Sequence, residues 1–185
     1  MQTAIIGSGP SLNNSGKGEY IDSFYTVIRF PNNVDWQNKD DAGTKVSYYC
    51  CTMKRSERLR LPLECGCFLW SKYKNKFAAK KKAAEVGCVD VTDLICGWQK
   101  ELPKKCYPYF SCGIAAICIA MAKIKNKITV FGCDALKDGN PHRGKYIGSW
   151  VYENRPQNRS HHSFDEERKL VDIMSDYYDV EVYFD

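Results

Sequence analysis

The segment that most constrains the fold of this chain is residues 113–124, which are apolar around nearly the whole circumference of a helix. A helix on the surface of a protein keeps one polar face, so this composition predicts a helix that is buried on all sides. The segment leads into residues 128–131, a β-branched and aromatic run that is typical of a central strand. We therefore expect the core to be built around this helix and strand.

Strand patterns and helix patterns alternate along the rest of the chain. We expect strands over residues 4–6, 25–30, 45–51, 67–70, 88–94, 128–131 and 180–184, helices over residues 72–86, 113–124 and 164–177, one helical turn over residues 19–22 and a turn over residues 40–43. This alternation predicts an α/β fold with a mostly parallel, twisted sheet, flanked by helices and joined by right-handed crossovers. The chain has 185 residues and shows no repeat or linker, so we expect a single Rossmann-like domain over residues 1–185.

The composition is that of a globular protein, with 44% hydrophobic residues and a net charge of +5. The positive charge is concentrated in residues 72–82 and 100–105, which we interpret as the solvated faces of helices. We find no nucleic-acid recognition motif and expect no nucleic-acid partner. No apolar run reaches the length of a membrane span, and no signal peptide is recognisable, so we expect a cytoplasmic protein.

The ten cysteines do not form a pattern of disulfide or metal spacing. Several lie inside apolar runs, where a thiol packs as a small hydrophobic group. Without a secretory signal, reduced thiols are expected. Cys65 and Cys67 are not accompanied by a second Cys or His pair at zinc-ligand spacing, and we expect no metal site.

A glycine-rich turn, Gly7-Ser-Gly-Pro-Ser11, directly follows the first expected strand. In a doubly wound sheet this is where nucleotides bind, because glycines allow the backbone to approach a phosphate. Leu12 replaces the third glycine of the dinucleotide fingerprint, and no acidic residue ends the second strand, which argues against an NAD site. A tight turn without a ligand is the alternative.

A second turn of small residues, Phe110-Ser-Cys-Gly113, precedes the buried helix. Ser111 can cap that helix, and Gly113 permits the close approach of a ligand. Capping alone would explain the serine. Both turns would open on the same carboxyl edge of a parallel sheet.

Two of the three histidines, His161 and His162, are adjacent and lie at the entrance of the last expected helix. Imidazole is the side chain whose pKa best suits proton transfer near neutral pH. The alternative is that both are surface residues next to a helix cap formed by Ser160 or Ser163.

Three groups of residues, taken in order, resemble the sialylmotifs of sialyltransferases. Residues 6–12, 15–22, 27–29, 32 and 42–45 look like the large motif, residues 109–117 and 130–134 look like the small motif, and residues 162–167 are similar to the very small motif, a histidine with an acidic residue five positions on. The eukaryotic sialyltransferases (glycosyltransferase family 29) and the bacterial ones (family 42) share these elements, and this chain resembles both.

The resemblance implies a GT-A-like variant of the Rossmann fold and an inverting, metal-independent transferase without a cofactor. It would move sialic acid, or a related acid sugar, from a CMP-sugar donor to the hydroxyl of a glycan or other acceptor. By position it assigns the nucleotide and donor contacts to Gly7, Ser8, Gly9, Pro10, Ser11, Asn32, Ser111, Cys112 and Gly113, the base to His162, and the group that assists phosphate departure to His142, with Tyr146 as the second choice.

The chain departs from the family pattern at several positions. Pro31 follows Arg29-Phe30, so Asn32 fits only with a shift of one residue, Ser8 replaces an asparagine, and Leu136 stands where a tyrosine is expected. The cysteine pair of the animal enzymes is not reproduced, and the chain is shorter than most members, which would suit a viral or bacterial enzyme. A CMP-Kdo-type transferase is therefore one alternative. A nucleotide- or glycan-binding module without turnover is another.

Overall fold

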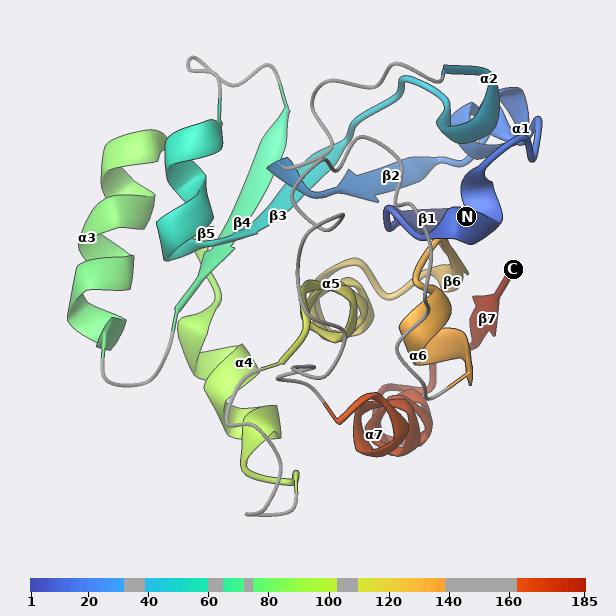
Figure 1. Cartoon of the computed structure of the whole chain (residues 1–185). Coiled ribbons are helices and arrows are strands. Elements are labelled where there is room, and N and C mark those ends of the chain that lie inside the picture. The colour runs from blue at the N-terminus through green and yellow to red at the C-terminus, as the bar shows by residue number, and fades with distance from the viewer. Residues whose placement is uncertain (32–38, 60–64, 72–74, 103–109, 139–162) are drawn as a thin grey trace, which may run out of the picture.

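The computed structural model describes residues 1–31, 39–59, 65–71, 75–102, 110–138 and 163–185. Within them, one sheet of seven parallel strands runs in the order β5-β4-β3-β2-β1-β6-β7 (Figure 1). The strands are β1 (Gln2–Ile6), β2 (Thr26–Arg29), β3 (Tyr48–Thr52), β4 (Gly66–Trp70), β5 (Val89–Asp90), β6 (Lys127–Phe131) and β7 (Val182–Phe184). The predicted α/β fold with a parallel sheet is confirmed.

Helices cover both faces of this sheet (Figure 1). One face carries α4 (Thr92–Gln99), α5 (Cys112–Ile119) and α7 (Phe164–Tyr178), and the other carries α1 (Gly18–Asp22) and α3 (Lys76–Val86). Shorter helical segments are η1 (Pro10–Leu12), α2 (Lys39–Ala42), η3 (Met53–Arg58), η5 (Ala120–Ile124) and α6 (Asp134–Asp138). Because side chains alternate along a strand, Cys50 and Phe68 face α5 whereas Cys51 and Cys67 face α3.

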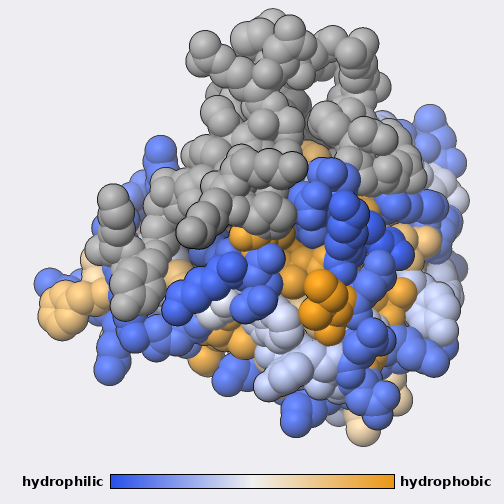
Figure 2. All heavy atoms as spheres, turned by 90° about the horizontal axis from the view of Figure 1, so that it is seen from below, coloured by the Kyte–Doolittle hydropathy of each residue, from blue (hydrophilic) through white to orange (hydrophobic). Residues whose placement is uncertain are grey.

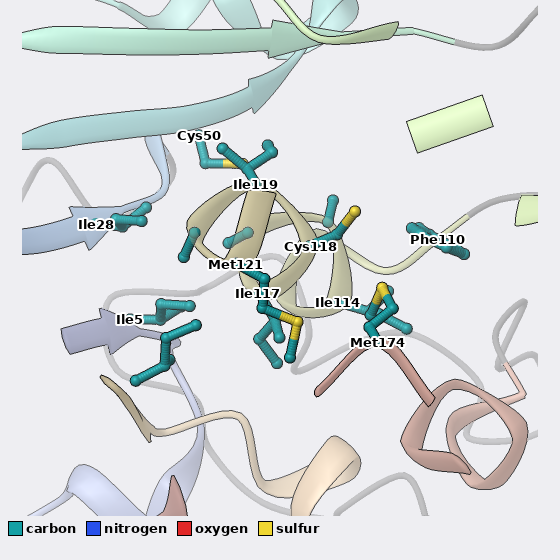
Figure 3. Close-up of a cluster of buried hydrophobic side chains, with 14 of the residues drawn as sticks. Ile5, Ile28, Cys50, Phe110, Ile114, Ile117, Cys118, Ile119, Met121 and Met174 are labelled. Atoms are coloured by element: carbon teal, nitrogen blue, oxygen red, sulfur yellow. The ribbon is translucent and has the colours of Figure 1, made fainter. Parts of the chain in front are cut away.

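Helix α5 lies at the centre of the larger core, as its composition predicts. Residues 114–119 are all buried, and side chains of the sheet and of α7 surround the helix (Figure 3). A π-helical segment, η5, continues it to Ile124, and Lys125 then ends it in the left-handed conformation. Burial of each large aliphatic side chain stabilises the fold by about 1.5–3 kcal/mol, so this helix contributes strongly to stability.

Two of the expected elements differ in the structure. The strand expected over residues 88–94 ends at Asp90, and the rest of that prediction is wrong because α4 begins at Thr92. The Asp90 carboxylate accepts hydrogen bonds from the Thr92 backbone N–H and hydroxyl, at 3.0 and 2.6 Å, and so forms a local turn at the start of α4. The turn expected over residues 40–43 is instead the single helical turn α2, followed by Gly43 at a φ of 68°.

The outer surface is not uniformly polar. Seen from the side on which α4 and α7 lie, hydrophobic side chains remain visible between hydrophilic ones (Figure 2). On α7 itself, Ile173 and Tyr177 are more than half exposed. Exposed apolar residues of this kind are common on folded proteins. Among the helices in the described residues, none has the length and apolar character needed to cross a bilayer.

The direction of strand addition reverses between β1 and β6, and here two backbone segments pack tightly. The Gly7 N–H donates to the Phe131 carbonyl and the Gly9 N–H donates to the Gly132 carbonyl, both at 2.7 Å. A Cβ atom added to Gly7 would lie 2.1 Å from the Gly132 carbonyl oxygen. Only glycine therefore fits at position 7. We call the two segments, residues 7–12 and 132–136, the junction.

Replacing Gly7 by alanine tests this packing. Gly7→Ala should lower the free energy of unfolding by about 2 kcal/mol or more, because the clash is with backbone and cannot be relieved by a rotamer change. The measurement is urea denaturation followed by circular dichroism. Gly97→Ala is the matched control, since a Cβ atom there meets nothing within 4 Å and alanine suits the interior of α4. Equal stability of the two variants would contradict the conclusion that position 7 has no room for a Cβ atom.

Candidate functional site

The junction is the natural place for a ligand in this topology. The chain builds outward from β1 to β5 and then returns to place β6 on the other side of β1. In open α/β sheets, ligands bind outside the carboxyl ends of the strands at such a switch point. The turn over residues 7–11, which directly follows β1, lies at this switch point.

Asp134 holds the glycine-rich turn in place. Its buried carboxylate accepts a hydrogen bond from the Ser11 backbone N–H at 3.0 Å and a second one from the Ser11 hydroxyl. A Cβ atom on Gly9 would lie 2.5 Å from the same carboxylate, so Gly9 also serves this packing. Sequence reasoning gave Asp134 no role, although it closes the small-motif segment and could have been found there.

The hydrogen bonds of the turn restrict what it can offer to a ligand. The amides of Gly7 and Gly9 donate to backbone carbonyls, the Ser11 amide donates to Asp134, and Pro10 has no N–H. Ser8, which is half-buried, lies between the two engaged glycines. A phosphate or nucleotide at this turn would therefore meet Ser8 before the glycine amides.

The second predicted turn, at the start of α5, lies against the same junction. The Cys133 thiol would lie 2.7 Å from a Cβ atom on Gly7 and 3.4 Å from one on Gly113, so it fills the space between the two turns. Leu136 contacts Gly113 in the same way. Burial raises the pKa of Cys133 to about 12, with the nearby Asp134 acting in the same direction, so this thiol is neutral near pH 7. The structure thus brings together the turns over residues 7–11 and 111–113.

Helix α7 is attached to this second turn by a buried carboxylate. The Ser111 hydroxyl caps α5 by accepting from the Ile114 N–H at 3.3 Å, while the Ser111 N–H donates to Glu167 Oε1 at 2.9 Å. Glu167 is 1% exposed, and its own N–H donates to the Ser163 carbonyl at 2.8 Å. The acidic residue of the very small motif is therefore in contact with the small motif.

Several predicted site residues cannot be placed in this way. Asn32, His142, Tyr146, His161 and His162 lie outside the described residues. Their roles stay predictions. Two neighbours in sequence are described, however: Pro31, which is buried, and Ser163, which directly precedes α7.

A buried polar network occupies much of the large-motif region. The Arg29 side chain is fully buried and donates to the carbonyls of Lys45 and Ala42, both at 2.7 Å. Its guanidinium lies 3.7 Å from the Asp22 carboxylate. Burial lowers the pKa of Arg29 to about 10, and Asp22 opposes that shift, so Arg29 keeps its charge near pH 7. The network fixes the end of β2, from which the chain continues toward Asn32.

A second carboxylate ties the segment after the glycine-rich turn to α2. Asp41 is buried and accepts hydrogen bonds from the Asn14 N–H at 2.7 Å and the Gly16 N–H at 2.9 Å. Gly18 packs against α2, since a Cβ atom there would lie 2.1 Å from the Lys39 carbonyl oxygen. Residues that look like a ligand-binding motif in the sequence therefore hold the loop scaffold together.

Comparisons with known proteins agree with the geometry. Residues 1–61 match the family model of glycosyltransferase family 29 (sialyltransferase). The crystal structure of a mammalian sialyltransferase is similar with a TM-score of 0.64 and 16% identity, over 98% of this chain and 68% of that chain. A mammalian sialyltransferase in complex with Gal-beta-1-3GalNAc-ortho-nitrophenol gives a TM-score of 0.60 and 15% identity over the same shares. No curated protein sequence matches significantly. The resemblance to sialyltransferases is thereby confirmed, in sequence over the first 61 residues and in fold over nearly the whole chain.

The charge network predicts a specific acid sensitivity. Burial raises the pKa of Asp22, but hydrogen bonds from Thr44 and Lys45 and the nearby Arg29 lower it, and the net pKa is below the ordinary value of 3.8. Asp22 therefore contributes stability that is complete above its unfolded-state pKa and is lost as the pH falls through the folded-state pKa. Asp22→Asn should be less stable at pH 7 and should lose less stability below about pH 4. Urea unfolding at each pH measures both effects. If the unfolding free energy of the variant changed with pH just as that of the wild type does, the proposed contribution of Asp22 would be refuted.

Removing the acceptor on α7 tests the link between the motifs. Glu167→Ala should lower the free energy of unfolding by about 2 kcal/mol, because the buried Ser111 N–H loses a charged acceptor. Glu167→Gln keeps an acceptor oxygen and should lose less. Glu166→Ala is the matched control, since Glu166 forms a surface ion pair with Lys169, and such pairs contribute about 0–1 kcal/mol. Chemical denaturation measures the free energy of unfolding of the three variants. Equal losses in Glu166→Ala and Glu167→Ala would exclude a stabilising link between Glu167 and Ser111.

Proposed function

We propose that this protein is a sialyltransferase-like glycosyltransferase, which moves sialic acid or a related acid sugar from a CMP-sugar to an acceptor hydroxyl. One observation carries the proposal. The three motif segments, far apart in the sequence, meet at the switch point of a sialyltransferase-like sheet: the turn over residues 7–11 through Asp134, the turn over residues 111–113 through Cys133, and α7 through Glu167. The family match over residues 1–61 supports the same conclusion.

The donor would bind across the two turns. The first turn of α5 directs backbone N–H groups and the positive end of the helix dipole toward the carboxyl edge of the sheet, which suits the carboxylate of an acid sugar. Ser8 is the residue of the glycine-rich turn best placed for the nucleotide, because its neighbours are engaged in the junction. The resemblance adds Asn32, Cys112 and Gly113 to the donor contacts.

Transfer needs a base at the acceptor and a donor at the leaving group. His162 is the proposed base that takes the proton of the acceptor hydroxyl, and His142 or Tyr146 would donate to the departing phosphate. The residue after His162 is Ser163, whose carbonyl is hydrogen-bonded to the helical turn that Glu167 fastens to Ser111. This connection supports a base entering the site from the start of α7. The reaction would invert the anomeric centre without a metal.

The acceptor is proposed to be a glycan hydroxyl. A similar mammalian sialyltransferase was crystallised with Gal-beta-1-3GalNAc-ortho-nitrophenol, which supports a sugar as the acceptor class.

The histidine pair offers an internal control for this mechanism. His162→Ala should lower transfer from CMP-sialic acid to a galactoside by roughly 10²–10⁴-fold, the usual contribution of a general base, while CMP binding stays near wild type. His161→Ala should keep activity close to wild type. Rates are measured by product formation. Unchanged turnover in His162→Ala would refute the role of His162 as the base.

The competing functions are separated in the same assay. Wild-type protein is titrated with CMP in a calorimeter and then offered CMP-sialic acid and CMP-Kdo as donors. Preferred turnover of CMP-Kdo would support the rival transferase. CMP binding without transfer or hydrolysis of either donor would indicate a binding module. Absence of CMP binding would reject the whole proposal.

A further inference from the structure

Three cysteines lie in one row on the α3 side of the sheet, away from the junction. Cys51 belongs to β3, Cys67 to β4, and Cys88 directly precedes β5. Cys51 and Cys67 belong to the buried core cluster under α3, and the partly buried Cys88 packs against it. We call them the thiol row. None of them has a role in the proposed transfer reaction.

The strand register places two members of the row opposite each other. Phe68 pairs with Val89 and Leu69 pairs with Asp90 in the parallel ladder between β4 and β5. One step back along both strands, Cys67 is opposite Cys88, and both side chains point to the α3 face. Neighbouring strands lie about 4.8 Å apart, which is within the Cα separation that a disulfide spans.

Proximity and burial distinguish the members of the row. The Cys51 and Cys67 sulfurs are 3.9 Å apart, and the strand register places Cys88 on the other side of Cys67. Cys51 and Cys67 are buried, whereas Cys88 is only partly buried and lies 3.9 Å from the Val86 carbonyl oxygen. Cys88 is therefore the member of the row that a dissolved reagent reaches first.

The electrostatics of the pair favour the same order of reaction. The neighbouring Cys67 thiol lowers the pKa of Cys88, and burial opposes this only in part. The neighbouring thiols Cys51 and Cys88 raise the pKa of Cys67 well above its usual range. Because the thiolate is the reactive form of cysteine, this direction agrees with the greater accessibility of Cys88.

We propose that Cys88 is a peroxide-oxidisable thiol and that Cys67 resolves it as an intramolecular disulfide. The Cys88 thiolate attacks one oxygen of a hydroperoxide, the O–O bond breaks, and Cys88 becomes a sulfenic acid while the other oxygen leaves and is protonated. The Cys67 sulfur then attacks the Cys88 sulfur, the S–O bond breaks, and hydroxide leaves with the Cys67 proton as water. Two thiols and hydrogen peroxide thus give one disulfide and two waters.

The bond would fasten the short edge strand to the sheet. β5 has two residues, and α3, which precedes it, is anchored on this face by Ala79 and Ala83. A link from Cys88 to Cys67 closes the loop that contains α3. Because β3 and β2 separate β4 from β1, the link would not touch the junction directly.

The experiment is mild oxidation of the whole chain with hydrogen peroxide, followed by alkylation of remaining thiols and non-reducing peptide mass spectrometry. Wild-type protein should yield a peptide pair joined through Cys67 and Cys88. Cys88→Ser should yield no disulfide in the thiol row. Cys67→Ser should instead accumulate Cys88 sulfenic acid, detected as its dimedone adduct. Cys118→Ser is the matched control and should behave as wild type, since Cys118 is buried in α5 with a raised pKa.

Two results would overturn the proposal. One is a disulfide that joins Cys67 to Cys51 or to Cys65 instead of to Cys88. The other is modification of Cys88 no faster than that of the buried Cys96, whose pKa burial raises. Circular dichroism of each variant before oxidation confirms that the comparison is made on folded protein.

Discussion

The carboxyl edge of this sheet depends on one contact, the packing of the backbone after β1 against the Gly132 carbonyl after β6. The two segments approach so closely that position 7 has no room for a Cβ atom. Their amide–carbonyl pairs continue the β1–β6 ladder beyond the strands. Because the strand order reverses there, the same contact fixes the positions of Asp134 and Cys133, against which the other turns rest. A glycine pattern that suggests phosphate binding is thus first a requirement of chain packing.

Buried or half-buried carboxylates hold the loops in place by accepting backbone hydrogen bonds, as the β-ladder holds the strands. Each accepts backbone N–H groups from a segment distant in the sequence, and such charge-assisted hydrogen bonds are stronger than neutral ones. The acceptors are Asp22 for residues 44 and 45, Asp41 for residues 14 and 16, Asp134 for residue 11, and Glu167 for residue 111. Loops at the edge of a sheet have unpaired amides, and here acidic side chains satisfy them. The motif positions are in large part the scaffold of the site.

Local patterns predicted the sheet well, because most of its strands and the helix α5 carry their own apolar signature. The prediction was wrong after Asp90, where the Asp90 carboxylate binds the Thr92 N–H and α4 begins instead. The turns over residues 7–11 and 111–113 were predicted to share an edge, and the structure brings them together. What the sequence could not supply was the pairing of Ser11 with Asp134, 123 residues away, or of Ser111 with Glu167, 56 residues away. Such pairs exist only once the sheet has formed.

In the proposed enzyme, the residues that hold the loops in place and the residues that react would be different ones. Because Asp22, Asp41, Asp134 and Glu167 hold the frame, the proposed transfer would take its proton acceptor from another residue. Imidazole meets that need near neutral pH, and a histidine just before α7 would enter beside the Ser111 turn because Glu167 binds that turn. Glu167, the acidic residue of the very small motif, would then only position the proposed base His162 and would take no part in proton transfer. Under this proposal, the histidine and the glutamate five residues apart in one motif would perform different tasks.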